Sequence, residues 1–304
     1  MIRRIAVVAG IAGVLVLLLF LPFVFKDRTR MHLAGPHLAD VRYTEVAFRN
    51  GDLPLAGMLF LPEGDGPFPA AVIIHGSGTS RRDNPWYLTV AAHLQKNGVA
   101  VLLPDKRGSE KSKGDWRQAS FADLAGDAVA AARYLETQDR FRCSRVGLVG
   151  MSQGGWIAPL AAVTDSSISF VVGMSGPGVT TDEQLVYEES YNIADVGTWH
   201  VVGRLLAPLI AMGVQRSSFW GHIAGFDPLP WWRKVRVPAL AAYGAGDENV
   251  PVEESVRRLR GLGNPHLLLH VYPDGGHGIL ERVDPRTLRI QGAFLADMTD
   301  LIRH

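Results

Sequence analysis

The sequence predicts an α/β fold with a mainly parallel sheet, an N-terminal antiparallel hairpin, helices on both faces and a cap insertion. Continuous apolar runs such as residues 70–74 alternate at short spacing with helical stretches, a pattern typical of parallel strands buried on both faces. Asn50-Gly51, between two alternating runs, is a strong hairpin signal. The alternation stops near Gly178 and resumes after Arg233, so residues 178–233 are expected to form the cap.

The composition indicates one large globular domain. The chain has 304 residues, of which 47% are hydrophobic, enough for a substantial core. Its formal charge is +1, which gives no reason to expect a nucleic-acid partner. The single cysteine, Cys143, excludes an intrachain disulfide.

The N-terminus carries a separate signal. After Arg3 and Arg4, residues 5–25 form an uncharged apolar run of 21 residues, long enough to cross a bilayer as a helix. The run has no small-residue cleavage site, so we expect residues 1–25 to be an uncleaved signal anchor, with a cleaved signal peptide as the alternative. Residues 26–40 are predicted to be a linker and residues 41–304 the main domain, placed on the periplasmic or extracellular side because long domains translocate largely regardless of charge.

The remaining elements are predicted in chain order. Residues 41–48 and 53–61 form the strands of the hairpin. Ser120, with Asp123 three residues later, resembles a capping box and begins a helix with one apolar face. Further strands are expected at 70–74, 99–103, 170–174, 239–243 and 267–272, with another ending at residue 150, and further helices at 86–97, 252–262 and 285–302.

The strand that ends at Gly150 runs into Gly150-Met151-Ser152-Gln153-Gly154, a G-x-S-x-G motif followed by a helix. In that context the serine lies on a sharp turn and projects its hydroxyl beyond the end of the sheet, which favours a nucleophile. An ordinary turn with a solvated serine is the alternative, because the motif also occurs by chance.

A nucleophilic serine needs a base and an acid, and in this topology they follow it in the order acid, then histidine. Asp247 follows the strand predicted at 239–243, and His277 follows the strand predicted at 267–272. Both would lie at the same edge of the sheet as Ser152, so the three are the candidate catalytic residues. Glu248 is an alternative acid, and Asp274 is expected to form a turn.

The negative charge that develops on a substrate oxygen needs fixed N–H donors. The backbone N–H of Gln153, directly after the candidate nucleophile, is the first candidate donor. The second is expected from the glycine-containing loop at residues 75–78, through the N–H of Ser77.

The cap segment contains four of the seven tryptophans. An insertion at this edge of the sheet would cover the ligand site, so Trp199, Trp220 and Trp231 are candidate substrate contacts. The alternative is that these indoles hold the cap to the body.

Over residues 41–304 the chain resembles the α/β-hydrolase superfamily, and within it the bacterial serine esterase and serine peptidase-like group. The matching motifs are His-Gly-Ser-Gly at 75–78, Asp-Lys-Arg-Gly at 105–108, Gly-Met-Ser-Gln-Gly-Gly at 150–155, Gly-x-x-Asp-x-x-Val-Pro ending at 251, and Gly-His-Gly at 276–278. The resemblance implies Ser152, Asp247 and His277 as a catalytic triad, Ser77 and Gln153 as oxyanion donors, and neither a metal nor an organic cofactor. Relatives carry a glycine or another small residue where this chain has Glu110.

These observations together predict a membrane-anchored serine hydrolase that cleaves small-molecule carboxylic esters through an acyl-enzyme intermediate. An aminopeptidase-like amide hydrolase, a thioesterase and a lipase are the enzymatic alternatives. A non-catalytic, membrane-tethered binding protein is the alternative from another class.

Overall fold

The computed structural model describes residues 13–14, 17–26, 30–138 and 142–304. Most of the predicted signal anchor, residues 1–12 and 15–16, lies outside these ranges. The described end of the apolar run includes the short helix α2 (Leu21–Phe25). Within the described ranges, no helix is both long and apolar enough to cross a membrane. The anchor therefore stays a prediction.

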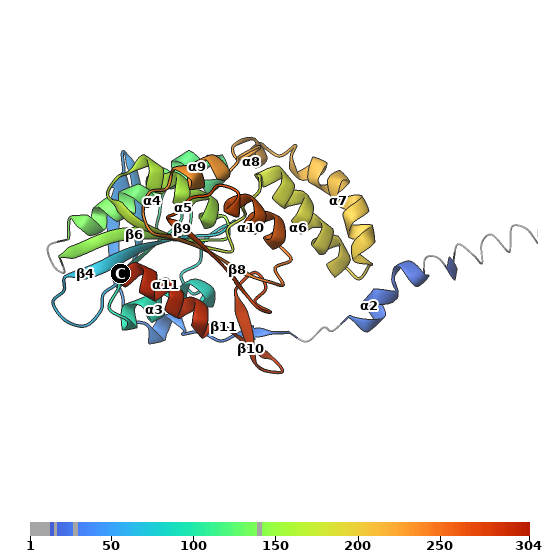
Figure 1. The fold of residues 1–304 in the computed structure, drawn as a ribbon, viewed down its shortest axis with the longest axis horizontal. Helices are drawn as coiled ribbons and strands as arrows, with labels where there is room; N and C mark the ends of the chain where they lie inside the picture. The colour runs from blue at the N-terminus through green and yellow to red at the C-terminus, as the bar shows by residue number, and fades with distance from the viewer. Residues whose placement is uncertain (1–12, 15–16, 27–29, 139–141) are drawn as a thin grey trace, which may run out of the picture.

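The body of the molecule is built on one eight-stranded sheet (Figure 1). The strands lie in the order β2-β3-β5-β4-β6-β7-β8-β9, and the first two junctions are antiparallel while all later ones are parallel. Their bounds are β2 Thr44–Asn50, β3 Leu53–Phe60, β4 Phe68–Ile74, β5 Ala100–Pro104, β6 Cys143–Met151, β7 Ile168–Met174, β8 Ala239–Gly244 and β9 Leu267–Tyr272. The predicted hairpin and mainly parallel sheet are confirmed.

Helices cover both faces of this sheet (Figure 1). One face packs against α3 (Pro85–Lys96) and α11 (Gly292–Arg303), and the other against α4 (Phe121–Glu136), α5 (Gly154–Thr164) and α10 (Val252–Arg260). Successive residues of β4 alternate between these two cores, with Val72 in one and Ile73 in the other. This two-sided burial explains why the central strands read as unbroken apolar runs.

The predicted capping box is present at the start of α4. Asp123 N donates to Ser120 Oγ at 3.2 Å, and Ser120 N donates to Asp123 Oδ2 at 2.8 Å. The two orphan N–H groups at the helix end are thus satisfied by side chains that lie three residues apart in the sequence.

Between β7 and β8 the chain forms four helices instead of continuing the strand-helix alternation. They are α6 (Thr181–Asp195), α7 (His200–Val214), α8 (Ser218–Gly221) and α9 (Leu229–Lys234). The α9 helix packs back onto the body through the fully buried Trp232, whereas α6 and α7 form a pair that projects from it (Figure 1). These helices occupy the segment predicted to be the cap.

The predicted helix over residues 285–302 is wrong in its first half. The structure has an antiparallel hairpin, β10 (Leu280–Asp284) and β11 (Thr287–Ile290), before α11 begins. The order Thr287-Leu288-Arg289-Ile290 alternates polar and apolar residues, as a strand does. In the predicted linker, β1 (His32–Leu33) pairs in parallel with β11, a contact between segments too distant in sequence for local patterning to indicate.

Candidate active site

Ser152 lies on a sharp turn between β6 and α5. Its backbone adopts φ +54°, a left-handed conformation that is costly for a residue with a side chain. A Cβ atom on Gly150 would lie 2.1 Å from the Gly154 carbonyl oxygen, and one on Gly154 would lie 2.3 Å from the Ile74 carbonyl oxygen. The glycines of the motif are thus required by close backbone contacts, and the strained turn holds the Ser152 hydroxyl beyond the strand end.

The structure brings Ser152, His277 and Asp247 into one chain of contacts. Ser152 Oγ lies 3.0 Å from His277 Nε2. His277 Nδ1 lies 2.9 Å from Asp247 Oδ2 and 3.1 Å from Oδ1. With Nδ1–H donating to the carboxylate, Nε2 is left as the acceptor for the serine proton, which is the arrangement a general base requires.

Asp247 is held rigidly on the far side of the imidazole. Its side chain is 0% exposed, and its Oδ1 accepts hydrogen bonds from the backbone N–H groups of Asn249 at 2.8 Å and Val250 at 2.9 Å. The cap also contacts this loop, since the Tyr187 hydroxyl of α6 donates to the Asp247 carbonyl oxygen at 3.1 Å. Asp247, and not its neighbour Glu248, contacts His277.

The loop after β4 lies directly against the serine. A Cβ atom on Gly76 would lie 3.2 Å from Ser152 Cβ, and the Gly76 N–H donates to the buried Tyr87 hydroxyl at 2.8 Å. Within the described residues, neither the Ser77 N–H nor the Gln153 N–H has a hydrogen-bond acceptor. The two expected oxyanion donors therefore come from segments that meet at Ser152, and their role stays a prediction.

Lys106 joins these two segments, a role that none of the sequence-based predictions included. Its Nζ donates to the carbonyl oxygens of Gly76 at 2.6 Å and Gly78 at 3.1 Å and to Gln153 Oε1 at 2.9 Å. All three partners can only accept, so the set of contacts requires the three N–H groups of an ammonium ion. The residue is 7% exposed, and this burial lowers the pKa of Lys106 to about 7. Lys106 directly follows β5 and so lies at the same edge of the sheet as Ser152. That position in the sequence could have indicated a residue of the site.

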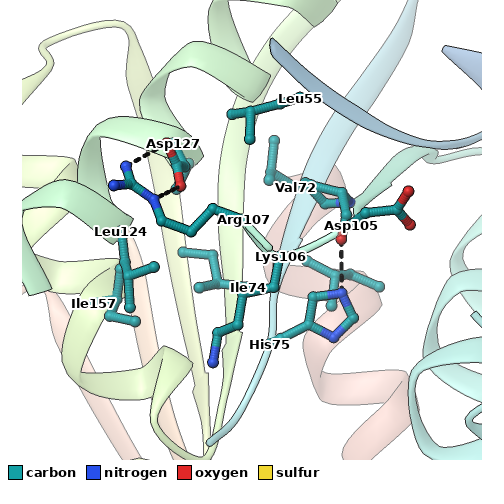
Figure 2. A pocket seen from close by; sticks show the side chains of 13 residues that line it. Leu55, Val72, Ile74, His75, Asp105, Lys106, Arg107, Leu124, Asp127 and Ile157 are labelled. Atoms are coloured by element: carbon teal, nitrogen blue, oxygen red, sulfur yellow. Dashed lines mark hydrogen bonds and ion pairs between the residues drawn. The ribbon is translucent and has the colours of Figure 1, made fainter. Parts of the chain in front are cut away.

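Lys106 and its neighbour Arg107 point in opposite directions (Figure 2). The Arg107 guanidinium forms an ion pair with Asp127 of α4, with Nε 2.7 Å from Oδ2. The small pocket shown in Figure 2 is lined by Lys106 and Arg107 and by His75. Neither Ser152 nor His277 lines this pocket, so it is distinct from the triad.

His75 is not a second base. Its Nε2 lies 2.7 Å from the Pro104 carbonyl oxygen, which can only accept, so Nε2 carries the proton. Burial, with a smaller contribution from nearby Lys106, lowers the pKa of His75 to about 4. The imidazole is therefore neutral near pH 7 and adds no positive charge beside Lys106.

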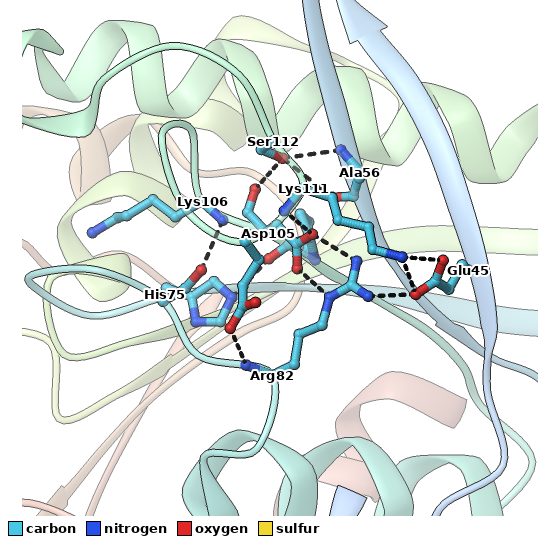
Figure 3. A network of polar contacts seen from close by, with 11 residues as sticks. Glu45, Ala56, His75, Arg82, Asp105, Lys106, Lys111 and Ser112 are labelled. Atoms are coloured by element: carbon cyan, nitrogen blue, oxygen red, sulfur yellow. Dashed lines mark hydrogen bonds and ion pairs between the residues drawn. The ribbon is translucent and has the colours of Figure 1, made fainter.

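A network of ion pairs fixes the loop that carries Lys106 (Figure 3). The Arg82 guanidinium forms a two-pronged contact with the buried Asp105 carboxylate at 2.8 and 2.7 Å, and its Nη1 contacts Glu45 at 2.7 Å. This pairing raises the pKa of Arg82 above its usual range. Lys111 also contacts Glu45, at 2.6 Å. In the same loop Glu110 adopts φ +47°, which explains why relatives are expected to carry glycine there.

The structure gives the three candidate tryptophans of the cap other contacts. Trp199 Nε1 donates to the Leu18 carbonyl oxygen at 2.8 Å, and Trp220 Nε1 donates to Asp182 Oδ1 at 3.1 Å. Trp231 packs against the main core with the Lys234 ammonium 5.3 Å from its ring centroid. Their role as substrate contacts stays a prediction that these contacts do not support.

Two other indoles lie nearer to the site. The Trp86 ring centroid is 5.8 Å from that of His277, and Lys106 Nζ is 5.5 Å from the Trp116 ring centroid. Trp116 also packs edge-on against Phe219 of the cap. The Nε1 atoms of Trp86 and Trp116 are buried without a hydrogen-bond partner within the described part of the chain. Both indoles lie in segments that follow a central strand. This position in the sequence could have indicated that they lie near the site.

A model of the prolyl oligopeptidase family matches residues 85–301 of this chain. The chain is 26% identical to esterase EstD of Thermotoga maritima over 273 residues, which cover 83% of this chain and 64% of EstD. It is 26% identical to the human acylamino-acid-releasing enzyme over 233 residues, which cover 70% of this chain and 29% of that protein. The chain thus spans less than two thirds of the length of these relatives.

Solved structures show the same architecture. An esterase of Pyrococcus furiosus has a TM-score of 0.64 at 20% identity and covers 91% of this chain and 98% of its own. A dienelactone hydrolase of Anabaena variabilis has a TM-score of 0.58 at 23% identity and covers 86% of this chain and 97% of its own. The predicted α/β-hydrolase fold and the resemblance to the esterase and peptidase group are confirmed.

Proposed function

We propose that this chain, which belongs to the prolyl oligopeptidase family, is a serine hydrolase that cleaves carboxylic esters through an acyl-enzyme intermediate. The observation that carries the proposal is the contact chain from Ser152 Oγ through His277 to the fully buried Asp247. A serine hydroxyl held 3.0 Å from an imidazole that a carboxylate orients is an activated nucleophile.

In the first half of the reaction Ser152 Oγ attacks the ester carbonyl carbon while His277 Nε2 takes the hydroxyl proton. The carbonyl oxygen becomes negatively charged, and the N–H groups of Ser77 and Gln153 are the donors that would stabilise it. The bond from carbon to the alkoxy oxygen then breaks, and His277 returns the proton to the leaving alcohol. In the second half water attacks the acyl-enzyme with the same histidine as base, which releases the carboxylic acid and restores Ser152.

We propose an ester as the substrate, and not another acyl compound, because two of the similar proteins are named as esterases. EstD is named as an esterase, and so is the structural neighbour of Pyrococcus furiosus. The acylamino-acid-releasing enzymes favour amide hydrolysis as the second candidate, and a thiohydrolase of Aspergillus aculeatus, 34% identical over 135 residues, supports a thioesterase as the third. A lipase, which takes esters with long acyl chains, remains a further alternative.

A fluorophosphonate probe tests the catalytic serine directly. The full chain is expected to be labelled, and the Ser152→Ala variant is expected to remain unlabelled. Equal labelling of the two proteins would overturn the proposal by assigning the reactive nucleophile to another residue. No labelling of either protein would overturn it and favour a non-catalytic binding protein. A panel of matched esters, thioesters and aminoacyl amides with increasing acyl length then separates the reaction classes by their kcat/KM values.

We infer further that residues 1–25 anchor the protein in a membrane with the catalytic domain on the periplasmic or extracellular side. The support is the uncharged run of 21 residues in the sequence. The full chain is expected to resist carbonate extraction from membranes, and its catalytic domain is expected to be cleaved by protease added to cells whose outer envelope has been opened while the cytoplasmic membrane stays sealed. Release by carbonate, or protection from the protease, would contradict the anchor or its orientation respectively.

A further inference from the structure

The outer face of α7 is apolar and exposed. Seen down the helix axis, one side of α7 packs against α6 through the small residues Gly203, Ala207 and Ala211. The opposite side presents large apolar side chains to the outside, and we call this the outer face of α7. Its residues are Val201, Leu205, Leu206, Leu209, Ile210 and Met212. Soluble helices normally place polar residues on such a side, so a helix with apolar residues on two opposite sides needs a second apolar environment.

The contact between α6 and α7 is so close that it determines which side of α7 faces outward. A Cβ atom on Gly203 would lie 1.9 Å from the Ser190 carbonyl oxygen of α6, so a larger residue there would separate the two helices. Rotation of α7 to bury its outer face would bring large side chains to this position. The exposure of the outer face is therefore a property of the packing.

The charges around α7 suit a lipid surface. Arg204 is the only Asp, Glu, Lys or Arg residue within α7, and Arg216 follows the helix. The nearest acidic residues in the sequence are Asp195, which pairs with Lys26, and Asp227. An apolar helix face flanked by basic side chains is the pattern of helices that lie in the interface of membranes with anionic lipids. A neighbouring protein segment would not require this absence of acidic residues.

The N-terminal apolar run meets the same end of the cap. Trp199, directly before α7, donates its indole N–H to the Leu18 carbonyl oxygen at 2.8 Å, and a Cβ atom on Gly197 would lie 2.6 Å from Phe23 Cβ. Lys26 forms an ion pair at 3.0 Å with Asp195 at the end of α6. Figure 1 shows α2 beside this end of the α6–α7 pair. The outer face of α7 thus continues an apolar surface that begins in the predicted anchor.

We propose that the outer face of α7 lies in the interface of a lipid bilayer, beside the N-terminal segment, so that the cap rests on the membrane. Trp199 then occupies the level of the headgroups, which tryptophan prefers. On its other side α6 contacts the catalytic loop, since Gln184 Nε2 donates to the Asn249 carbonyl oxygen at 3.0 Å. The α6–α7 pair then lies between the lipid surface and the loop of Asp247.

The test measures the depth of one side chain in a bilayer. The full chain carries Cys143→Ser and Leu209→Cys, is labelled with an environment-sensitive fluorophore and is reconstituted into vesicles of phosphatidylcholine and phosphatidylglycerol. Leu268→Cys in the same background is the matched control, because Leu268 in β9 is 62% exposed and Leu209 is 59% exposed. Retained hydrolytic or fluorophosphonate-labelling activity checks that both labelled proteins are folded.

The label at residue 209 is expected to shift its emission to the blue and to be quenched by brominated lipids, while the label at residue 268 shows neither effect. The proposal would be overturned if the emission of both labels were typical of a fluorophore in water. A blue-shifted label at residue 209 that brominated lipids do not quench would also overturn it, because the face would then be covered by protein, either a second copy or the N-terminal segment. Absence of vesicle binding by the full chain would have the same consequence.

Discussion

The Lys106 ammonium donates a hydrogen bond to the Gln153 side-chain oxygen, 2.9 Å away, and so connects the loop after β5 to the residue that follows the nucleophile. The same ammonium binds two carbonyl oxygens of the loop after β4, at Gly76 and Gly78. The segments that carry both expected oxyanion donors are therefore held by one buried charge.

We expect Lys106→Met to lower kcat by about 10- to 100-fold with a small change in KM, because the oxyanion donors would lose their fixed positions. Lys111→Met is the matched control, since Lys111 lies on the same loop but contacts the exposed Glu45. Steady-state kinetics of both variants, with thermal unfolding as the check on folding, measure the effect. Equal kinetics for the two variants would exclude a positioning role for Lys106.

The pH dependence of kcat should reveal the same group. Burial lowers the pKa of Lys106 from 10.5 to about 7, and the three acceptors need its charged form. Activity is thus expected to fall as the pH rises through about 7 and above, and this alkaline decline should be absent from the reduced activity of Lys106→Met. The facing groups from the neighbouring segments are the neutral His75, the Asp105 carboxylate and the Trp116 ring. A flat wild-type profile up to pH 10 would contradict the prediction.

Stability should change in the opposite direction to activity over this range. Because the folded-state pKa of Lys106 lies below its unfolded value, the folded protein binds fewer protons than the unfolded chain between pH 7 and 10.5. This group therefore adds to the free energy of unfolding as the pH rises through that window. Thermal unfolding curves at each pH distinguish this titration from alkaline unfolding as the cause of lost activity.

Asp247→Asn should leave the fold intact and lower kcat by about 10⁴-fold, because an amide can hold His277 in the wrong tautomer and cannot stabilise the imidazolium. The backbone donors from Asn249 and Val250 can still bind the amide oxygen, so the loop is expected to keep its conformation. Glu248→Gln is the control for the adjacent carboxylate. A larger loss of kcat in Glu248→Gln would assign the acid to Glu248.

Arg82→Met should destabilise the fold by about 3 kcal/mol, because it leaves the buried Asp105 carboxylate without its two-pronged partner. Arg81→Met is the matched control, since Arg81 is a neighbouring arginine whose ion pair with Asp83 is exposed. Chemical denaturation of both variants measures the free energy of unfolding. Similar values for the two would show that the Arg82 pair contributes no more than a surface contact.

Trp86→Leu should raise KM for bulky esters more than for acetyl esters, because the Trp86 ring lies beside His277 and its indole N–H has no protein partner within the described residues. Trp231→Leu is the comparison, since the Trp231 ring packs against the core. KM values over a series of ester sizes test both substitutions. A selective effect of Trp231→Leu alone would restore the expectation that the cap tryptophans contact the substrate.

The central strands and the turn at Ser152 were predictable because their signals are local. A strand buried on both faces is an uninterrupted apolar run, and the G-x-S-x-G motif marks the turn within five residues. The motif does so although the contact that demands glycine at position 154 is with Ile74, which is distant in sequence. Asp247 and His277 were also predictable, because parallel strands all end at one edge and each residue directly follows such a strand.

The pairing of β11 with β1, the role of Lys106 and the position of Trp86 depend on partners that are distant in sequence. β11 is stabilised by pairing with β1, some two hundred and fifty residues earlier, and Lys106 binds acceptors on two other loops. Hydrogen bonds and burial of this kind arise only when the chain has folded, so the sequence can place these residues at a strand end or in a strand but does not identify their partners. Periodicity shows which side chains avoid water, whereas the three-dimensional packing selects the particular neighbours that each buried charge and each indole meets.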